Sequence, residues 1–217
     1  MRRTVYTAVL AAVLPLLSVF SAHPAAAATT YQAELRTAVA SLPVATEKRT
    51  GYQRTAFTHW VDADGDGCNT RNEVLVAEAT TKPKVGSRCA LSGGKWVSYY
   101  DRRTWTDRGR LDIDHMVPLA EAWDSGAARW TAAQRKAYAN DLGDPRSLVA
   151  VTDSVNQQKS DRDVAEWLPT YDRCRYVREW TAVKIRWRLA VDTAEKAALR
   201  QVAAGCANVA VTVKRAR

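Results

Sequence analysis

Four cysteines constrain this chain more than any other feature, because all of them lie beyond a leader typical of exported proteins. The leader, residues 1–28, has Arg2 and Arg3 at its start, an apolar stretch over residues 9–20 and small alanines at its end, which is the pattern of an export signal. The apolar stretch is shorter than the ~20 residues that a membrane span requires. An even number of cysteines in an exported chain indicates disulfides. We therefore expect a secreted protein with residues 29–217 as its mature part and no stable membrane association.

The cysteine pairing follows from a helical hairpin near the end of the chain. Helical periodicity begins at Cys174, and a second helix begins at Asp192, where Glu195 is placed to complete a capping box. The two arms are nearly equal, at about 20–25 Å each, so the start of the first helix faces the end of the second. This predicts the disulfide Cys174–Cys206 and, by default, Cys68–Cys89. The chain has no CxxC pair, which argues against a zinc site.

The mature chain predicts one α+β domain that is weighted toward helix. Its length suits a single core with little room for a second domain, and we expect a monomer. Apolar periodicity and turn residues predict the elements. Helices are expected over residues 31–42, 118–123 and 131–142 and in the C-terminal hairpin that finishes the chain, and strands over residues 74–79, 95–100, 110–114 and 147–152.

The segment LDIDHMVPL, residues 111–119, carries the residue types for phosphodiester hydrolysis. A strand ends at Asp114 and His115, a second strand follows a long loop, and Asn156 lies in the first turn of the next helix. Hydrolysis needs a deprotonated water and a cation that holds the developing charge. A neutral imidazole can accept the proton, and carboxylate and amide oxygens suit Mg²⁺ or Mn²⁺. We expect His115 to be the general base, with Asp114 and Asn156 as metal ligands.

Two spaced motifs resemble the HNH endonuclease family. They are D-x-D-H-x-V-P at residues 112–118 and N-x-x-K-S-D at residues 156–161. The nearest resemblance is to secreted actinobacterial members that are related to the C-terminal domain of GmrSD restriction enzymes, and it covers residues 51–206. It implies a ββα-metal motif, in which two strands and a helix hold the metal, and a product with a 5′-phosphate.

The resemblance also implies a role for each matched residue. Asp114 is the first metal ligand, His115 the base and Asn156 the last ligand. The middle asparagine of the family has no clear position here, because Asn140 falls in an expected helix. The orientation of the His115 ring is therefore left without an explanation.

Basic residues near the motifs are candidates for substrate phosphate contacts. Lys159 follows Asn156 by three residues, and Arg71 and Arg146 flank matched motifs. Without its leader the chain loses two arginines and no acid, so its formal net charge falls from +9 to +7, which favours a polyanionic partner. We expect DNA as substrate, with RNA left open and little sequence preference. Weaker candidates are Arg54, Arg102, Arg103, Arg110 and Arg162 for phosphate contact, and Trp105 for base stacking.

An acidic loop leaves an alternative function open. Asp62, Asp64 and Asp66 alternate before a glycine, and Glu73 follows at the closing position of an EF-hand calcium loop. Such a loop would hold a structural Ca²⁺, and the chain could then be a calcium-dependent extracellular binding module. A rigid turn stapled by Cys68 explains the same residues equally well.

Overall fold

An antiparallel ribbon of two strands, β6 (Leu111–His115) and β7 (Leu148–Thr152), separates two hydrophobic clusters. Alternate residues of β7 belong to different clusters, Leu148 and Ala150 to one and Val149 to the other. Side chains of a strand point alternately to its two faces, so a strand that is buried on both faces is apolar throughout. This explains the uninterrupted Leu-Val-Ala-Val sequence of β7.

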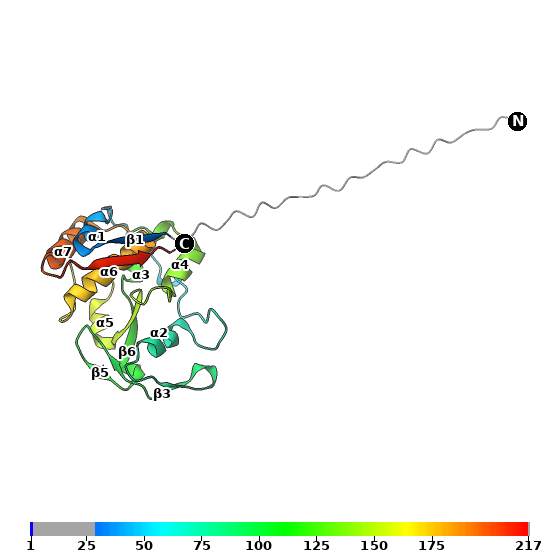
Figure 1. Cartoon of the computed structure of the whole chain (residues 1–217). Helices are drawn as coiled ribbons and strands as arrows, with labels where there is room; N and C mark the ends of the chain where they lie inside the picture. Colours follow the sequence, from blue (N-terminus) through cyan, green and yellow to red (C-terminus); the bar gives the residue numbers. More distant parts are fainter. Residues whose placement is uncertain (2–28, 217) are drawn as a thin grey trace.

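The computed structural model describes Met1 and residues 29–216, so apart from Met1 the expected export signal lies outside the described residues. Helices and strands are mixed along the chain (Figure 1), which confirms the expected α+β class. In the part of the chain that is described, no helix is long and apolar enough to cross a membrane.

The other elements are β1 (Thr30–Glu34), α1 (Leu35–Ser41), η1 (Arg54–Ala56), α2 (Thr70–Glu78), β2 (Lys84–Val85), η2 (Ser87–Cys89), β3 (Leu91–Ser92), β4 (Trp96–Val97), β5 (Thr104–Trp105), η3 (Arg108–Arg110), α3 (Leu119–Asp124), η4 (Ala127–Arg129), α4 (Ala132–Ala139), α5 (Asp153–Lys159), α6 (Arg173–Trp187), α7 (Thr193–Ala204) and β8 (Ala210–Lys214), where η denotes a single 3₁₀ turn.

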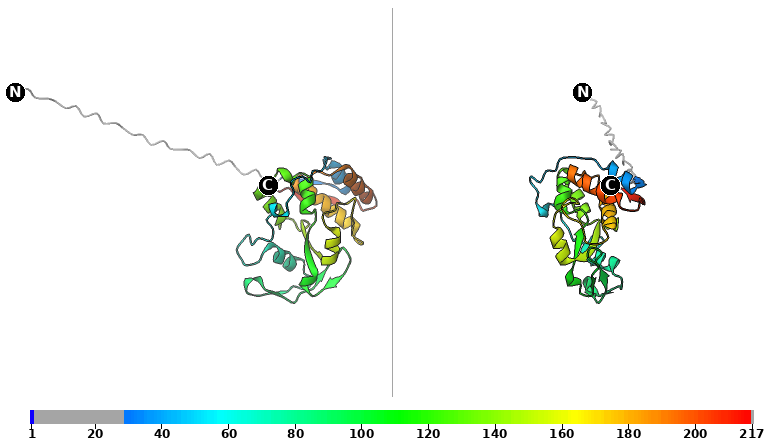
Figure 2. Two further views of the ribbon diagram at one scale, coloured as in Figure 1. Left: turned by 180° about the vertical axis from the view of Figure 1, so that it is seen from behind. Right: turned by 90° about the vertical axis from the view of Figure 1, so that its left-hand side faces the viewer.

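The C-terminal helices α6 and α7 pack together, with α1 against α7, at one end of the molecule (Figures 1 and 2). The disulfide Cys174–Cys206 joins the start of α6 to the residue beyond Gly205, which caps α7, with a Cα–Cα distance of 5.6 Å. The second disulfide, Cys68–Cys89, joins the residue before the N-cap of α2 to the end of η2, and α2 lies at the other end of the fold (Figure 1). Both predicted pairings are confirmed.

The buried side chain of Lys184 links the two hairpin helices to α3. Lys184 of α6 donates from Nζ to Glu121 of α3 at 2.5 Å and to Glu195 of α7 at 3.1 Å. The side chain of Asp192 caps α7 as predicted, because it accepts from the backbone N–H of Glu195 at 2.6 Å. The Glu195 side chain does not complete the predicted box. It turns inward instead and accepts from Lys184 and from the indole N–H of Trp180.

The ends of the described chain form a sheet that the sequence did not predict. The expected helix over residues 31–42 is a strand, β1, followed by the short helix α1. β1 pairs antiparallel with β8, which follows the C-terminal hairpin. The partner strands lie at opposite ends of the chain, so no local pattern reveals their pairing.

The expected strand over residues 74–79 is wrong, because these residues belong to α2. Asn69 caps this helix by accepting a hydrogen bond from the backbone N–H of Asn72 at 3.0 Å. Val74 and Leu75 are buried against β6 and β7. A tertiary contact and a cap thus outweigh the β-branched composition. Of the strand expected over residues 95–100, only the two residues of β4 are in a strand.

Candidate active site

The His115 imidazole, at the end of β6, is fixed by contacts on several sides. Its Nε2 atom lies 2.9 Å from the carbonyl oxygen of Ala139. The ring stacks on Trp60, with 5.4 Å between ring centroids and 28° between planes, and faces Tyr138 at 6.3 Å. A carbonyl oxygen only accepts, so Nε2 carries the proton and Nδ1 is the basic nitrogen of the neutral ring. This contact supplies the ring orientation that the sequence left unexplained.

Burial keeps this ring neutral. The His115 side chain is 6% exposed, and burial lowers its pKa to about 3, with the hydrogen bond to Ala139 acting in the opposite direction. The nearby positive charge of Arg54 lowers the pKa further. An anion in the neighbouring space would act against these effects, because it favours the protonated ring.

Asp114, the neighbouring residue, is buried and accepts two hydrogen bonds. The Tyr100 hydroxyl donates to Oδ2 at 2.6 Å, and Lys159 donates from Nζ to Oδ1 at 2.9 Å. Lys159 also donates to the backbone oxygen of His115 at 3.1 Å. Burial raises the pKa of the Asp114 carboxyl, and the two donors oppose that effect. The two donors hold the carboxylate in place.

Asn156 lies on α5, which follows β7 directly and packs against both strands of the ribbon. Its amide nitrogen donates to Oδ2 of Asp112 at 3.3 Å. Because this contact fixes which end of the amide faces Asp112, the carbonyl oxygen of Asn156 remains available as an acceptor or ligand.

One cavity brings the predicted residues together. Its volume is about 470 Å³, and His115, Asp114 and Asn156 all line it. Strand β6, the start of α3, α5 and the 3₁₀ turn η1 each contribute to its wall. The remaining lining residues are Tyr52, Arg54, Ile113, Pro118, Leu119, Ala120, Gln157, Ser160 and Asp161.

Arg54 is, with His115, the basic part of this cavity wall among the described residues. It belongs to η1 and is exposed. None of the ion pairs formed by the described residues involves it. A guanidinium that faces a cavity without a carboxylate partner can bind an anionic oxygen there.

The three cations predicted to contact phosphate are all engaged elsewhere, and none of them lines the cavity. Lys159 is fully buried in its contact with Asp114. Arg71 donates to the backbone oxygen of Leu111 at 2.8 Å. Arg146 makes two hydrogen bonds to Asp144, at 2.8 and 2.6 Å. All three cations are thus held by the protein away from this cavity, and their contact with a phosphate stays a prediction.

Asn140 holds the segment that covers the His115 ring. Its Oδ1 accepts from the backbone N–H of Val61 at 3.0 Å and from the Thr70 hydroxyl at 2.9 Å. Its Nδ2 donates to the backbone oxygen of Thr58 at 2.8 Å. The side chain therefore positions the loop on both sides of Trp60, while the preceding residue provides the carbonyl that orients the ring.

Three contributors to this site carry no recognisable signal in the sequence. Ala139 acts through its backbone oxygen, so its side chain carries no signal, and only the neighbouring Asn140 pointed to this region. Tyr100 and Trp60 lie in irregular segments, at distances along the chain that match no motif. Only their place in the folded chain brings them to Asp114 and His115.

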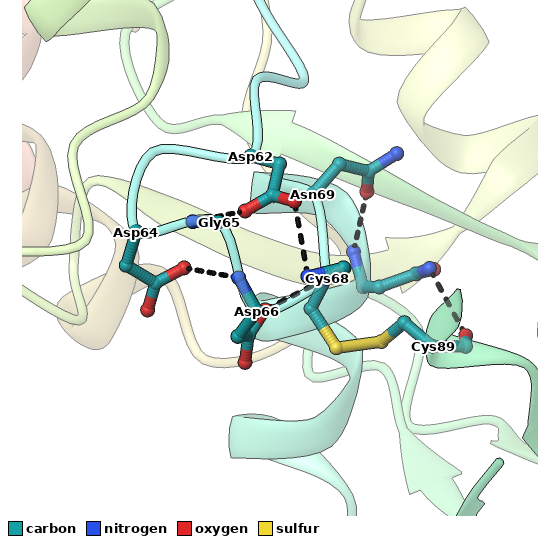
Figure 3. Close-up of a disulfide and its surroundings, with 9 residues drawn as sticks. Asp62, Asp64, Gly65, Asp66, Cys68, Asn69 and Cys89 are labelled. Carbon is teal, nitrogen blue, oxygen red and sulfur yellow. Dashed lines mark hydrogen bonds between the residues drawn. A yellow bond between two sulfur atoms is a disulfide. The ribbon is translucent and has the colours of Figure 1, made fainter. Parts of the chain in front are cut away.

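The acidic loop lies beside the disulfide Cys68–Cys89 (Figure 3). Carboxylate oxygens of Asp62, Asp64 and Asp66 lie within 4.8 Å of one another, and Asp66 and Glu73 are similarly close. Backbone N–H groups of the loop donate to Asp62 and Asp66, as a rigid turn would require. Burial and the three aspartates raise the pKa of Glu73. Asp66 thus lies close both to the other two aspartates and to Glu73, and calcium binding stays a prediction.

Comparison with known proteins places the chain in a family. The family model described as GmrSD restriction endonucleases, C-terminal domain, matches residues 72–202. A protein of Arthroderma benhamiae described as an uncharacterized secreted protein is 47% identical over 158 residues, which cover 72% of this chain and 76% of that protein. No solved structure matches the chain. The matched region of the family model is more than half of the sequence and includes Asp114, His115 and Asn156. The chain belongs to the family of GmrSD restriction endonuclease C-terminal domains.

Proposed function

We propose that this protein is a secreted, divalent-metal-dependent endonuclease that hydrolyses phosphodiester bonds of DNA, with His115 as its general base. The observation that carries the proposal is the single cavity lined by His115, Asp114, Asn156 and Arg54. The family is named for restriction endonucleases. The two disulfides and the secreted description of the relative support export.

His115 is suited to accept a proton from water. With Nε2 bound to Ala139, the basic Nδ1 remains, and no hydrogen bond links it to another described residue. The low pKa keeps the ring unprotonated at neutral pH. A phosphate in the cavity would raise that pKa toward the range in which a base is effective. The Ala139 carbonyl would then hold the protonated ring in the same orientation.

The donors in the cavity fit a hard divalent cation. Each carboxylate oxygen of Asp114 accepts one hydrogen bond and keeps a second lone pair. Together with the free amide oxygen of Asn156, these are oxygen ligands of the kind that Mg²⁺ and Mn²⁺ prefer. Asp114 and Asn156 would hold the ion, which when bound supplies positive charge that stabilises the reacting phosphate. Lys159 keeps Asp114 in place and offsets part of its charge.

Arg54, rather than the three cations expected from the sequence, is the residue suited to hold the substrate phosphate. It reaches the same cavity as His115 and has no carboxylate partner among the described residues. A guanidinium can bind two phosphate oxygens at once, which would place the phosphorus near the base. Among the described residues that line the cavity, no other side chain is cationic at neutral pH.

Plasmid nicking tests the proposal directly. The purified protein should nick supercoiled DNA with Mg²⁺ or Mn²⁺, lose this activity in EDTA and recover it when the metal is restored. Arg54→Gln should lower kcat/KM by roughly tenfold to a hundredfold, and Arg54→Lys should recover part of the loss, because the charge returns without the two-pronged geometry. Full activity in EDTA, or no cleavage of DNA or RNA with any divalent metal, would overturn the proposal.

A further inference from the structure

The exposed turn η3 lies just before strand β6 and carries two arginines that have no acidic partner among the described residues. Four arginines occur between positions 102 and 110. Arg102 pairs with Asp172 at 3.2 Å, and Arg103 lies 3.9 Å from Asp101. Within the described residues, the ion pairs include neither Arg108 nor Arg110. Their charge is therefore available to a partner.

The Arg110 guanidinium rests on an aromatic platform that is itself held in place. It lies over the Trp105 ring at 5.2 Å from the centroid. The Trp105 indole donates to the Thr152 hydroxyl at 2.8 Å, at the end of β7. Stacking on an aromatic face leaves the N–H edges of a guanidinium free for an anion. A surface arginine held in this way loses less entropy on binding than a free side chain.

Hydrogen bonds from Arg71 and Asp107 also fix the backbone of η3. Arg71 donates from Nη2 to the backbone oxygens of Leu111 at 2.8 Å and of Arg108 at 3.4 Å. Asp107 caps the turn by accepting from the backbone N–H of Gly109 at 2.8 Å. The backbone that carries the two free arginines thus has a fixed position relative to β6. This gives Arg71 a structural task in holding the turn.

The geometry of β6 relates these arginines to the site. Arg110 is the last residue of η3, and Leu111 begins β6 with an extended backbone, with φ −118° and ψ 136°. Asp114 follows Arg110 by four residues, so their Cα atoms are at most roughly 13 Å apart. Each strand of a duplex carries one phosphate per 3.4 Å of its axis, so a polynucleotide bound at the cavity has further phosphates within this distance.

We propose that Arg108 and Arg110, with Trp105 as platform, bind backbone phosphates of the substrate a few nucleotides from the bond that is cut. The inference rests on the proposed nuclease function and extends it, because it makes the substrate a polynucleotide that is long enough to reach η3. A small phosphodiester occupies the cavity without touching these arginines. The two contacts add affinity and register and take no part in the reaction at the phosphorus.

Two measurements with matched variants test this inference. The test variant is Arg108→Gln with Arg110→Gln. The control is Arg200→Gln with Lys214→Gln, which removes the same charge from exposed positions on α7 and β8, at the opposite end of the molecule (Figures 1 and 2). Fluorescence anisotropy with a labelled duplex of about 20 base pairs, in EDTA, gives Kd and its salt dependence. Steady-state kinetics with metal then compare that duplex with bis(p-nitrophenyl) phosphate.

The test variant should bind the duplex roughly tenfold more weakly, and the slope of log Kd against log salt should fall by about two, as expected for two lost phosphate contacts. The control should stay within about twofold of the wild type. Activity on bis(p-nitrophenyl) phosphate should be the same in all three proteins. Equal duplex affinity of test and control variants, or an equal loss on the small substrate, would overturn the inference. The binding measurement decides this even if the protein cuts nothing, so failure of the proposed nuclease function is seen separately.

Discussion

The Nε2 atom of His115 lies 2.9 Å from the carbonyl oxygen of Ala139, a residue 24 positions further along the chain. Ala139 is the last residue of α4, and the final carbonyl groups of a helix have no partner within it. The imidazole N–H meets one of these carbonyl groups, where the helix dipole also favours a donor. A helix end and a strand end thus fix the tautomer of the proposed base.

Replacing His115 with Gln should remove nuclease activity while leaving the fold intact. The side-chain nitrogen of Gln can donate to Ala139, but the amide has no basic nitrogen, so kcat should fall by about 10²–10⁴-fold. Initial rates of plasmid nicking and a thermal melt followed by circular dichroism give the two readouts. His59→Gln is the matched control, because the His59 ring bonds to the backbone of Phe57 and does not line the cavity. Loss of activity in His59→Gln with retention in His115→Gln would exchange their roles.

Replacing Lys159 with Met should destabilise the protein. Its ammonium is fully buried against Asp114, and removal of one partner of a buried ion pair costs about 3–5 kcal/mol. Urea denaturation measures the change in the free energy of unfolding. The double variant Lys159→Met with Asp114→Asn should recover much of the loss, since no buried charge is left alone. Unchanged stability combined with weaker DNA binding would instead return Lys159 to the role of a phosphate contact.

The parts of the site that could be predicted from the sequence are those encoded by short spacings. Asp114 and His115 are adjacent, and Asn156 lies at the start of the helix after the next strand. A strand end and a helix start have local signals, so the sequence alone is enough to assign the three residues to one site. The disulfide Cys174–Cys206 was predictable for the same reason, because two consecutive helices of nearly equal length fix which ends meet.

The parts that could not be predicted depend on contacts across the fold. Lys159 has the right spacing for a helix face beside Asn156, but spacing does not reveal that its side chain is buried against Asp114 and Trp180. Arg54 carried no more sequence signal than the other arginines, and only the fold brings it to the cavity. The pairing of β1 with β8 joins the two ends of the described chain and leaves no local trace.

Calcium should stabilise the protein through the acidic loop. Asp62, Asp64 and Asp66 repel one another, and a bound cation would relieve this repulsion. At a calcium concentration about a hundredfold above Kd, binding adds about 2.7 kcal/mol, which corresponds to a rise in Tm of roughly 5–10 °C for a chain of this size. Calorimetry of EDTA-stripped protein, with and without CaCl₂, measures the shift. Asp64→Asn should abolish it, whereas Glu166→Gln, an exposed acid outside the loop, should leave it unchanged.

The same experiment separates the calcium-module alternative from the nuclease. If the loop is structural, Asp64→Asn should still nick DNA under conditions in which it is folded. If nicking persists in His115→Gln and disappears in Asp64→Asn, the loop is the functional centre. The absence of any calcium-dependent change in the Tm of the wild type would leave the loop as a turn stapled by Cys68–Cys89.

The pH dependence of stability should report on Glu78, at the end of α2. Its carboxylate accepts from the backbone N–H of Ala150 at 2.7 Å, and burial raises its pKa from 4.5 to about 7. Between these values the folded protein holds a proton that the unfolded chain has released. The free energy of unfolding therefore falls as pH rises from about 4.5 to 7, by about 3 kcal/mol, and this contribution is constant above that range.

Glu78→Gln removes the titration and keeps an oxygen acceptor for Ala150. Urea denaturation at several pH values should show that the free energy of unfolding of Glu78→Gln rises relative to that of the wild type between pH 4.5 and 7. The corresponding difference for Glu166→Gln should stay constant. A Glu78→Gln difference that is flat over the whole range would mean that the carboxyl keeps its ordinary pKa, with water reaching it between α2 and β7.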